Sequence, residues 1–134
     1  MSSHYLKKEE KIRGIFNKVF RLKTEKKRDV PIGLQQHEFD IYQKSIVAGG
    51  ITTGRWKTGK SKGKNPSSGN RDRANREILW LTLVENVKRR ILIVTDKEMF
   101  RGLIGQLKGA NFKKRIGIML FDNKTKSFIR SEYL

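Results

Sequence analysis

The segment Arg89 to Thr95, with the sequence RRILIVT, constrains the fold of this chain more than any other. Its four central residues, Ile91 to Val94, are all large and apolar, and three of them are β-branched. A short continuous run of this kind is typical of a strand that is buried on both faces. We therefore predict a central strand here, in a sheet that is covered by helices.

Two segments have the spacing of helices that could cover this sheet. The segment 5–22 is predicted to be an amphipathic helix from its apolar residues Ile12, Ile15, Phe16, Val19 and Phe20. The segment 72–86 has near-helical apolar spacing after the polar run RDRANRE, which favours a helix over the alternative of a strand at 78–84. The segment 62–70, KGKNPSSGN, holds two glycines and a proline and is not expected to begin a helix.

A further helix is expected after the central strand. Thr95 and Glu98 have the spacing of a capping box, in which a Thr side chain and a Glu side chain satisfy the first free amides of a helix. We therefore expect this helix to open at Asp96 and to end near Gly109.

The remaining apolar segments predict strands. A hairpin is expected from 37–42, where apolar and polar residues alternate, and from the more apolar 45–53. The segments 115–121 and 127–130 predict two more strands, the last at an edge. Pro31 to Gly33 marks a loop or the entry to a strand. The whole order predicts an α/β sandwich of two or three layers around a mixed sheet.

The chain has 134 residues, a length that suits one domain over residues 1–134. Its 31 Lys and Arg against 13 Asp and Glu give a formal net charge of +18. So strong a positive field attracts polyanions, of which nucleic acid is the commonest. We expect a nucleic acid as the partner, and DNA ahead of RNA.

Several other classes of protein are excluded by composition. The chain has no cysteine and two histidines, so it offers no disulfides, no thiolate zinc site and no histidine metal cluster. No apolar stretch approaches the roughly 20 residues of a membrane span, and the N-terminal segment MSSHYLKKEEK lacks the apolar core of a signal peptide. A cytoplasmic location without membrane association is expected.

The positive charge is concentrated in one segment, which is expected to be a flexible loop over 54–71 that leads into a helix. This segment and the start of that helix hold eight cations against the single acid Asp72. With Trp56, which we expect to be exposed and able to stack on a base, they form the predicted nucleic-acid-binding set. The set is Arg55, Trp56, Lys57, Lys60, Lys62, Lys64, Arg71, Arg73 and Arg76. The alternative is a solvated charge run without a partner.

Residues 54–61, GRWKTGKS, satisfy the phosphate-loop pattern G-x-x-x-x-G-K-[ST]. Such a loop holds phosphates with its backbone amides and with the helix that begins at its Gly-Lys-Ser. The sequence KGKNPSSGN that follows argues against this helix. A nucleotide-binding protein is therefore a third hypothesis, behind two that depend on nucleic acid.

The hairpin HEFDIYQKSIVAGGITTG, the helix after it and RRILIVTD together resemble the PD-(D/E)XK superfamily of restriction-endonuclease-like nucleases, over about residues 5–96. The resemblance implies an αβββαβ core, in which an Asp on one strand and an (E/D)-x-K motif on the next bind divalent metal ions that activate water against a phosphodiester. By this resemblance Asp40 matches the first metal-binding acid.

The second motif is degenerate in this chain. Gly50 stands where the resemblance places the second acid, and Thr52 where it places the lysine. Some branches of the superfamily supply that acid from the following helix, which makes Glu77 the candidate, and Lys57 could take the basic role. Mg²⁺ needs several oxygen ligands, so one Asp alone would bind it poorly.

Two functions follow from this reasoning. The first is a Mg²⁺-dependent endonuclease or phosphodiesterase with Asp40 and Glu77 as metal ligands and Lys57 as a catalytic cation. The second is a non-catalytic DNA- or RNA-binding protein on the same fold. The distance between Asp40 and Glu77 separates them. A homodimer would suit the cutting of two strands, although the sequence does not require one.

Overall fold

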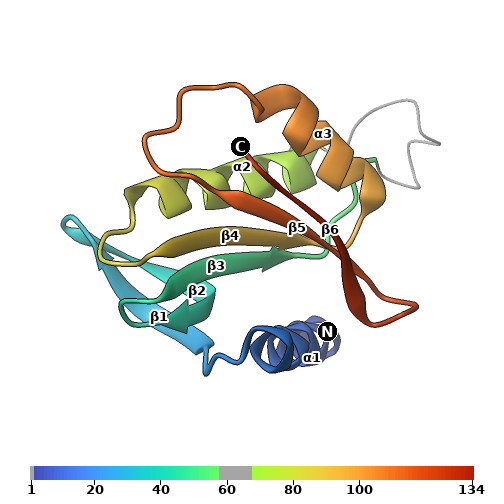
Figure 1. Cartoon of the computed structure of the whole chain (residues 1–134), viewed down its shortest axis with the longest axis horizontal. Helices are drawn as coiled ribbons and strands as arrows, with labels where there is room; N and C mark the ends of the chain where they lie inside the picture. Colours follow the sequence, from blue (N-terminus) through green and yellow to red (C-terminus); the bar gives the residue numbers. More distant parts are fainter. Residues whose placement is uncertain (1, 58–67) are drawn as a thin grey trace.

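The computed structural model describes residues 2–57 and 68–134. Over these residues the chain forms three helices and six strands (Figure 1). In chain order they are α1 (Ser2–Phe20), β1 (Glu25–Ile32), β2 (Gln35–Gln43), β3 (Val47–Thr52), α2 (Ser68–Leu83), β4 (Arg89–Val94), α3 (Lys97–Leu107), β5 (Gly117–Asp122) and β6 (Ser127–Tyr133).

The six strands form one mixed sheet in the order β1-β2-β3-β4-β5-β6. The central pairs β3–β4 and β4–β5 are parallel, and the outer pairs are antiparallel. Helix α1 covers one face of the sheet, and α2 and α3 cover the other (Figure 1). The predicted α/β sandwich around a mixed sheet is therefore confirmed, with three layers.

Strand β4 is the centre of the hydrophobic core, as its sequence predicted. Leu92 and Val94 pack in the apolar cluster under α2 and α3, whereas Ile91 and Ile93 pack in the cluster under α1. All four side chains are at least 92% buried, since the most exposed retains 8% of its surface. The burial of apolar surface on both faces of one strand is what holds the three layers together.

One strand was not predicted, and two local expectations were wrong. The polar segment before Pro31 is strand β1, which lies at the sheet edge and buries only Val30 fully, so it has no apolar alternation to reveal it. Helix α2 begins at Ser68, earlier than predicted and inside the segment expected to lack a helix start. Asp96, not Thr95, caps α3, because its carboxylate accepts a hydrogen bond from Met99 N.

The buried side chain of Arg90 satisfies carbonyl groups that follow the end of α2. This side chain lies behind the central strand with 8% of its surface exposed. Its guanidinium donates to the carbonyl oxygens of Val84 at 2.8 Å and Val87 at 3.2 Å. These carbonyls follow the last turn of α2 and point into the core, so the buried cation satisfies them and also opposes the negative end of the helix dipole.

None of the helices in the described part of the chain has the length and apolar character needed to cross a membrane.

Candidate functional site

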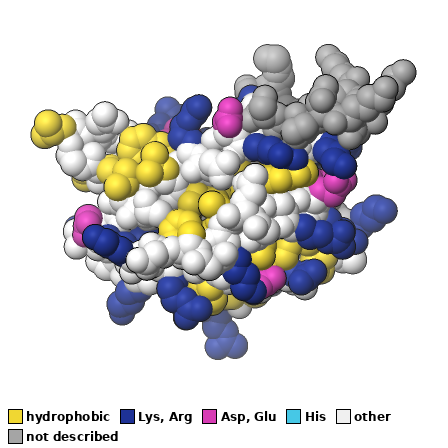
Figure 2. Space-filling model, turned by 90° about the horizontal axis from the view of Figure 1, so that it is seen from above, with side chains coloured by type: hydrophobic (Ala, Val, Ile, Leu, Met, Phe, Trp, Pro, Cys, Tyr) yellow, Lys and Arg dark blue, Asp and Glu magenta, His cyan; other side chains and the backbone are white. Residues whose placement is uncertain are grey.

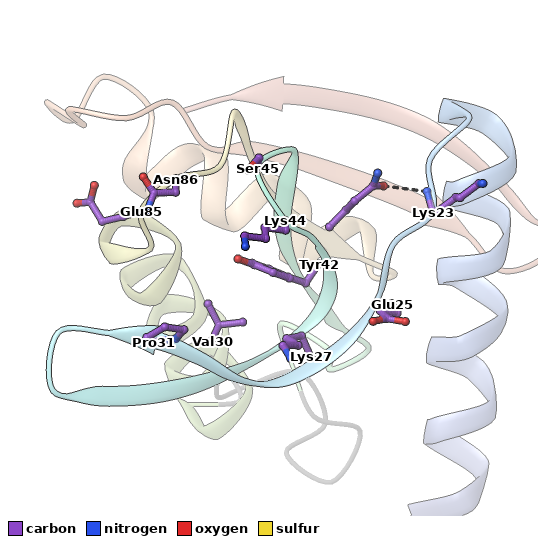
Figure 3. A pocket seen from close by; sticks show the side chains of 11 residues that line it. Lys23, Glu25, Lys27, Val30, Pro31, Tyr42, Lys44, Ser45, Glu85 and Asn86 are labelled. Carbon is purple, nitrogen blue, oxygen red and sulfur yellow. Dashed lines mark hydrogen bonds between the residues drawn. The ribbon is translucent and has the colours of Figure 1, made fainter.

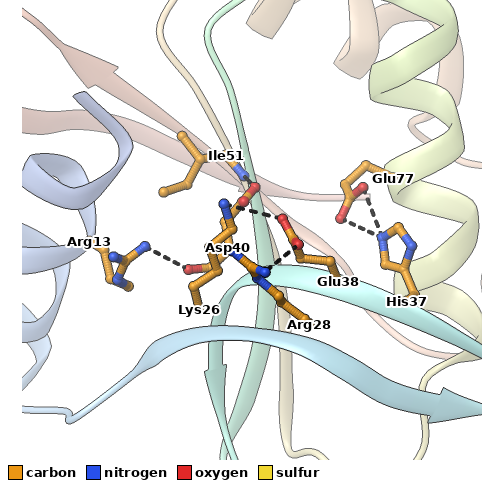
Figure 4. A network of polar contacts seen from close by, with 8 residues as sticks. All are labelled: Arg13, Lys26, Arg28, His37, Glu38, Asp40, Ile51 and Glu77. Carbon is orange, nitrogen blue, oxygen red and sulfur yellow. Dashed lines mark hydrogen bonds and ion pairs between the residues drawn. The ribbon is translucent and has the colours of Figure 1, made fainter. Parts of the chain in front are cut away.

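Asp40 lies where β2 and β3 separate. The last residue pair of their ladder toward this end joins Ile41 to Gly49. Beyond it, the Asp40 carboxylate accepts a hydrogen bond from Ile51 N at 2.9 Å, and Arg13 of α1 donates to the Asp40 carbonyl oxygen at 3.1 Å (Figure 4). Burial raises the pKa of Asp40, and the hydrogen bond from Ile51 opposes this effect. Asp40 therefore bridges two strands that no longer pair through their backbones.

Glu77 reaches the sheet from α2 and lies over β3. Its two carboxylate oxygens are 3.2 and 3.1 Å from His37 Nε2, and the His37 ring stacks on Trp80 with centroids 4.7 Å apart (Figure 4). A Cβ atom on Gly50 would lie 2.5 Å from Glu77 Cγ. Burial raises the pKa of Glu77, and the hydrogen bond to His37 opposes the rise. Gly50 is thus the residue that leaves room for the Glu77 side chain.

The two predicted metal ligands both reach β3 at neighbouring residues, because the Asp40 carboxylate accepts a hydrogen bond from Ile51 N and the Glu77 side chain lies over Gly50. Each carboxyl nevertheless has its own partner, a backbone amide for Asp40 and an imidazole for Glu77. Among the described residues, no group of three or more His, Asp or Glu side chains is placed to hold a metal ion. In this arrangement the pair does not fit Mg²⁺, which needs several free oxygen ligands.

A third acid, Glu9 of α1, belongs to the same cluster and was missed from the sequence. Its pKa is raised to about 7, first by burial and then by the charge of Asp40. Glu9 lies in the polar run KKEEK, where nothing distinguishes it from its neighbour Glu10. Only the packing of α1 against the sheet reveals it. Glu38, by contrast, is ion-paired with Lys26 at 3.2 Å.

Five of the predicted binding cations lie in the described residues, at the carboxyl end of β3 and the start of α2. They are Arg55, Lys57, Arg71, Arg73 and Arg76. Lys57, predicted to assist catalysis, is ion-paired with Glu98 of α3 at 3.7 Å. Lys60, Lys62 and Lys64 lie outside the described residues, as do residues 58–61 of the phosphate-loop pattern.

Trp56 is a partly buried anchor, and its expected exposure was wrong. Its backbone N–H donates to the Asp96 carboxylate at 2.9 Å. The guanidinium carbon of Arg71 lies 3.5 Å from the centroid of the ring, and a Cβ on Gly102 of α3 would lie 2.4 Å from a ring atom. The indole therefore packs between a cation of α2 and the backbone of α3. It ties the segment after β3 to both helices.

A small hollow of about 200 Å³ beside α3 adds cations that the sequence did not single out. Three cationic side chains, Lys97, Arg101 and Arg130, line it above an apolar floor that includes Phe100 and Leu120, and no acid lines it. Because α3 begins after the carboxyl end of β4, and β4 pairs in parallel with β3, this hollow lies at the same end of the sheet as the five cations described above. Figure 2 shows several Lys and Arg side chains along the right-hand edge of this view.

We call this surface the basic end. It consists of Arg55, Lys57, Arg71, Arg73, Arg76, Lys97, Arg101 and Arg130.

Comparisons with protein-family models, with curated proteins and with solved structures found no match for this chain. The resemblance to the PD-(D/E)XK superfamily therefore stays a prediction.

Proposed function

We propose that this protein binds nucleic acid, with the phosphate backbone lying on the basic end. The observation that carries the proposal is that Trp56 packs on Arg71 of α2 and against Gly102 of α3, and so joins the segment after β3 to both helices at the end of the sheet where these cations lie. Arg and Lys side chains at fixed positions on helices are the usual donors to phosphate oxygens. A net charge of +18 adds a long-range attraction that speeds the encounter.

The start of α2 strengthens this surface. Its first turn contains no acidic residue, so the positive end of the helix dipole is not neutralised there. Arg73 and Arg76 are exposed on its second and third turns. Arg73 also contacts Asn70, which donates to the Arg55 carbonyl oxygen at 3.0 Å. The side chains of Arg73 and Asn70 are thereby linked to the backbone of Arg55, and double-stranded DNA is the ligand that we propose for this surface.

Mg²⁺-dependent hydrolysis of the bound backbone is the second candidate function. It is favoured by one observation, that Glu77 fills the space above Gly50, where the resemblance places a metal-binding acid. Against it, both oxygens of Glu77 are held by His37. Hydrolysis would therefore require Glu77 to leave His37 when substrate and metal bind. Asp40 would then be the second metal ligand.

Fluorescence anisotropy with labelled 20-base-pair DNA, and with single strands of the same sequence, tests the binding proposal. We expect affinity for the duplex that falls steeply between low and physiological salt. Affinity that does not depend on salt would contradict the proposal. The same complexes, incubated with and without Mg²⁺, test hydrolysis. Cleavage that is lost in Asp40→Asn, a variant that keeps an acceptor for Ile51 N, supports the second candidate, and intact DNA leaves binding as the function.

A further inference from the structure

A hollow in the described part of the molecule lies at the opposite end of β3 and α2 from the basic end. Its volume is about 870 Å³. It is bounded by the β1–β2 hairpin, by the turn before β3 and by the residues that follow α2 (Figure 3). Strand β3 has six residues and α2 has 16, so roughly 20 Å separates their two ends. One phosphate cannot occupy both places.

An aromatic ring projects into this hollow. Tyr42 of β2 points toward its centre, between Lys44 and the apolar pair Val30 and Pro31 (Figure 3). One face of the ring packs toward Phe39, whose centroid is 6.3 Å away with an angle of 21° between the planes. The side chain is only partly buried, so part of the ring is open to a ligand. A planar ligand can therefore stack on Tyr42.

Three lysines come to the same hollow from three different segments. Lys23 precedes β1, Lys27 is on β1 and Lys44 is in the turn before β3. Two acids also line the hollow: Glu85 is ion-paired with Lys114 at 3.2 Å, and Glu25 faces β2. Lys27 is ion-paired with Asp29 at 3.2 Å, both side chains being about half exposed. The lining is therefore weakly positive, which suits one anionic group more than a continuous backbone.

Two turns that are joined by backbone hydrogen bonds form the rim of the hollow. Ser45 and Asn86 both line it, and both have positive φ, 68° and 62°. The two turns that hold them are joined by the backbone, because Lys88 N and Arg89 N both donate to the Ile46 carbonyl oxygen at 3.1 and 3.0 Å. The amide groups at this rim can therefore meet a ligand without reorganising the backbone.

We propose that this hollow binds a nucleoside monophosphate unit. The base stacks on Tyr42, the phosphate lies beside Lys44 and Lys27, and Asn86 offers an amide to the edge of the base (Figure 3). The unit is either a free mononucleotide or an unpaired nucleotide of a strand. The volume of the hollow lies within the range of small-molecule sites. The site does not depend on the basic end and would exist if that surface bound nothing.

Titration calorimetry and amide chemical shifts measure this binding with four probes: AMP, adenosine, inorganic phosphate and a 5′-phosphorylated hexathymidylate. AMP is expected to bind more tightly than adenosine or phosphate alone. Tyr42→Leu, which keeps an apolar side chain of similar length, is expected to weaken AMP at least about tenfold through the loss of stacking. Lys44→Gln is an exposed change that leaves folding intact, and it should weaken AMP while leaving adenosine unchanged.

Lys124→Gln, in the turn between β5 and β6, removes the same charge far from the hollow and is the matched control. If AMP fails to bind but the hexathymidylate binds, with the same losses in Tyr42→Leu and Lys44→Gln, the source of the unit is a strand. If neither probe binds, or if both bind equally to the two hollow variants and to Lys124→Gln, the proposal is overturned. Duplex affinity that persists in all three variants keeps the two proposals separate.

Discussion

The two ends of β3 and α2 both carry positive charge, but they present it in different ways. At the basic end the cations are mostly arginines, and the Trp56 indole there is already packed under Arg71. This surface therefore offers charge without an exposed aromatic ring. At the hollow end, three lysines alternate with two acids around a partly open tyrosine. The first arrangement suits a run of phosphates, and the second suits one phosphate with one ring. Both the balance of charge and the placement of aromatic side chains distinguish the two ends.

The largest effect is expected from neutralising the basic end. The triple variant Arg55→Gln, Arg73→Gln and Arg76→Gln removes three exposed cations from it. If each contacts one phosphate, each contributes about 0.9 to the slope of log affinity against log salt, or nearly tenfold in affinity at 0.1 M salt. We expect duplex affinity to fall on the order of 10²-fold and the slope to fall by about 2 to 3. Anisotropy over a salt series measures both.

The matched control removes three exposed lysines from α1, with Lys7→Gln, Lys11→Gln and Lys18→Gln. We expect this variant to lose less than about threefold in affinity, because it changes only the general field. Equal losses in the two triple variants would mean that a diffuse field holds the polyanion and that the basic end has no special role.

A second prediction concerns the close contact between Gly50 of β3 and Glu77 of α2. Gly50→Ala places a methyl group 2.5 Å from Glu77 Cγ, so Glu77 must leave His37 or α2 must shift from β3. We expect a loss of about 2 kcal/mol in the free energy of unfolding, measured by urea denaturation. The double variant Gly50→Ala with Glu77→Ala should recover part of this loss. A single variant as stable as the wild type would show that Glu77 does not pack there.

The sequence was sufficient for the fold wherever a segment was strongly apolar. The run Ile91 to Val94 predicted the central strand and, through it, the layered α/β arrangement. Strand β1 was missed because an edge strand needs few apolar residues, and its backbone pairing with β2 leaves no mark in the sequence. Helix starts depend on single capping side chains, so Asp96 and Thr95 could not be told apart before the packing of Trp56 was known.

The candidate site was predictable only in part. A lone Asp in an apolar strand and a basic segment are visible in the sequence, and they led to Asp40 and to five of the cations at the basic end. Glu9 and Tyr42 could not be found in this way, because their roles come from elements that meet only in the folded chain. His37 as the partner of Glu77 joins residues 40 positions apart, with no local signal.

The third prediction separates the packing of Trp56 from the positive charge of the basic end. Gly102 and Gly105 both lie inside α3, where replacing Gly by Ala ordinarily stabilises a helix by about 1 kcal/mol. A Cβ on Gly105 meets nothing within 4 Å, whereas one on Gly102 meets the Trp56 ring. We expect Gly105→Ala to raise the melting temperature by a few degrees. We expect Gly102→Ala to lower it and to weaken duplex binding several-fold, since Trp56 is displaced.

If Gly102→Ala behaved like Gly105→Ala in both the thermal melt and the anisotropy titration, Trp56 would not be the anchor of the basic end. The charge of the protein is the same in both variants, so any difference in DNA affinity reports on position alone.

The smallest expected effect is the pH dependence of stability that comes from the Glu9 carboxyl. The pKa of Glu9 is raised from 4.5 to about 7 in the folded chain, so folding favours its protonated form. The stabilisation is complete below about pH 4.5 and is lost as the pH rises through 7. Glu9→Gln keeps the neutral shape at every pH. We expect the free energy of unfolding of Glu9→Gln, taken relative to the wild type, to be about 1 kcal/mol higher at pH 8 than at pH 5. The difference is small because the side chain is partly exposed.

Thermal melts of Glu9→Gln and the wild type at the two pH values measure this gain as a difference of about 4 °C. Glu10→Gln, on the exposed neighbour, is the control and should show no such pH dependence. If Glu9→Gln were equally offset from the wild type at both pH values, burial would not raise the pKa of Glu9 in the folded chain.

Hydrogen exchange of the protein with and without a 20-base-pair DNA duplex tests most directly where nucleic acid lies. The account predicts that duplex slows exchange in the first turns of α2, over residues 68–77, and along α3, over residues 97–103, while α1 residues 7–18 exchange as in the free protein. Slower exchange centred on α1, or spread evenly over the described elements, would contradict the claim that the basic end is the nucleic-acid interface.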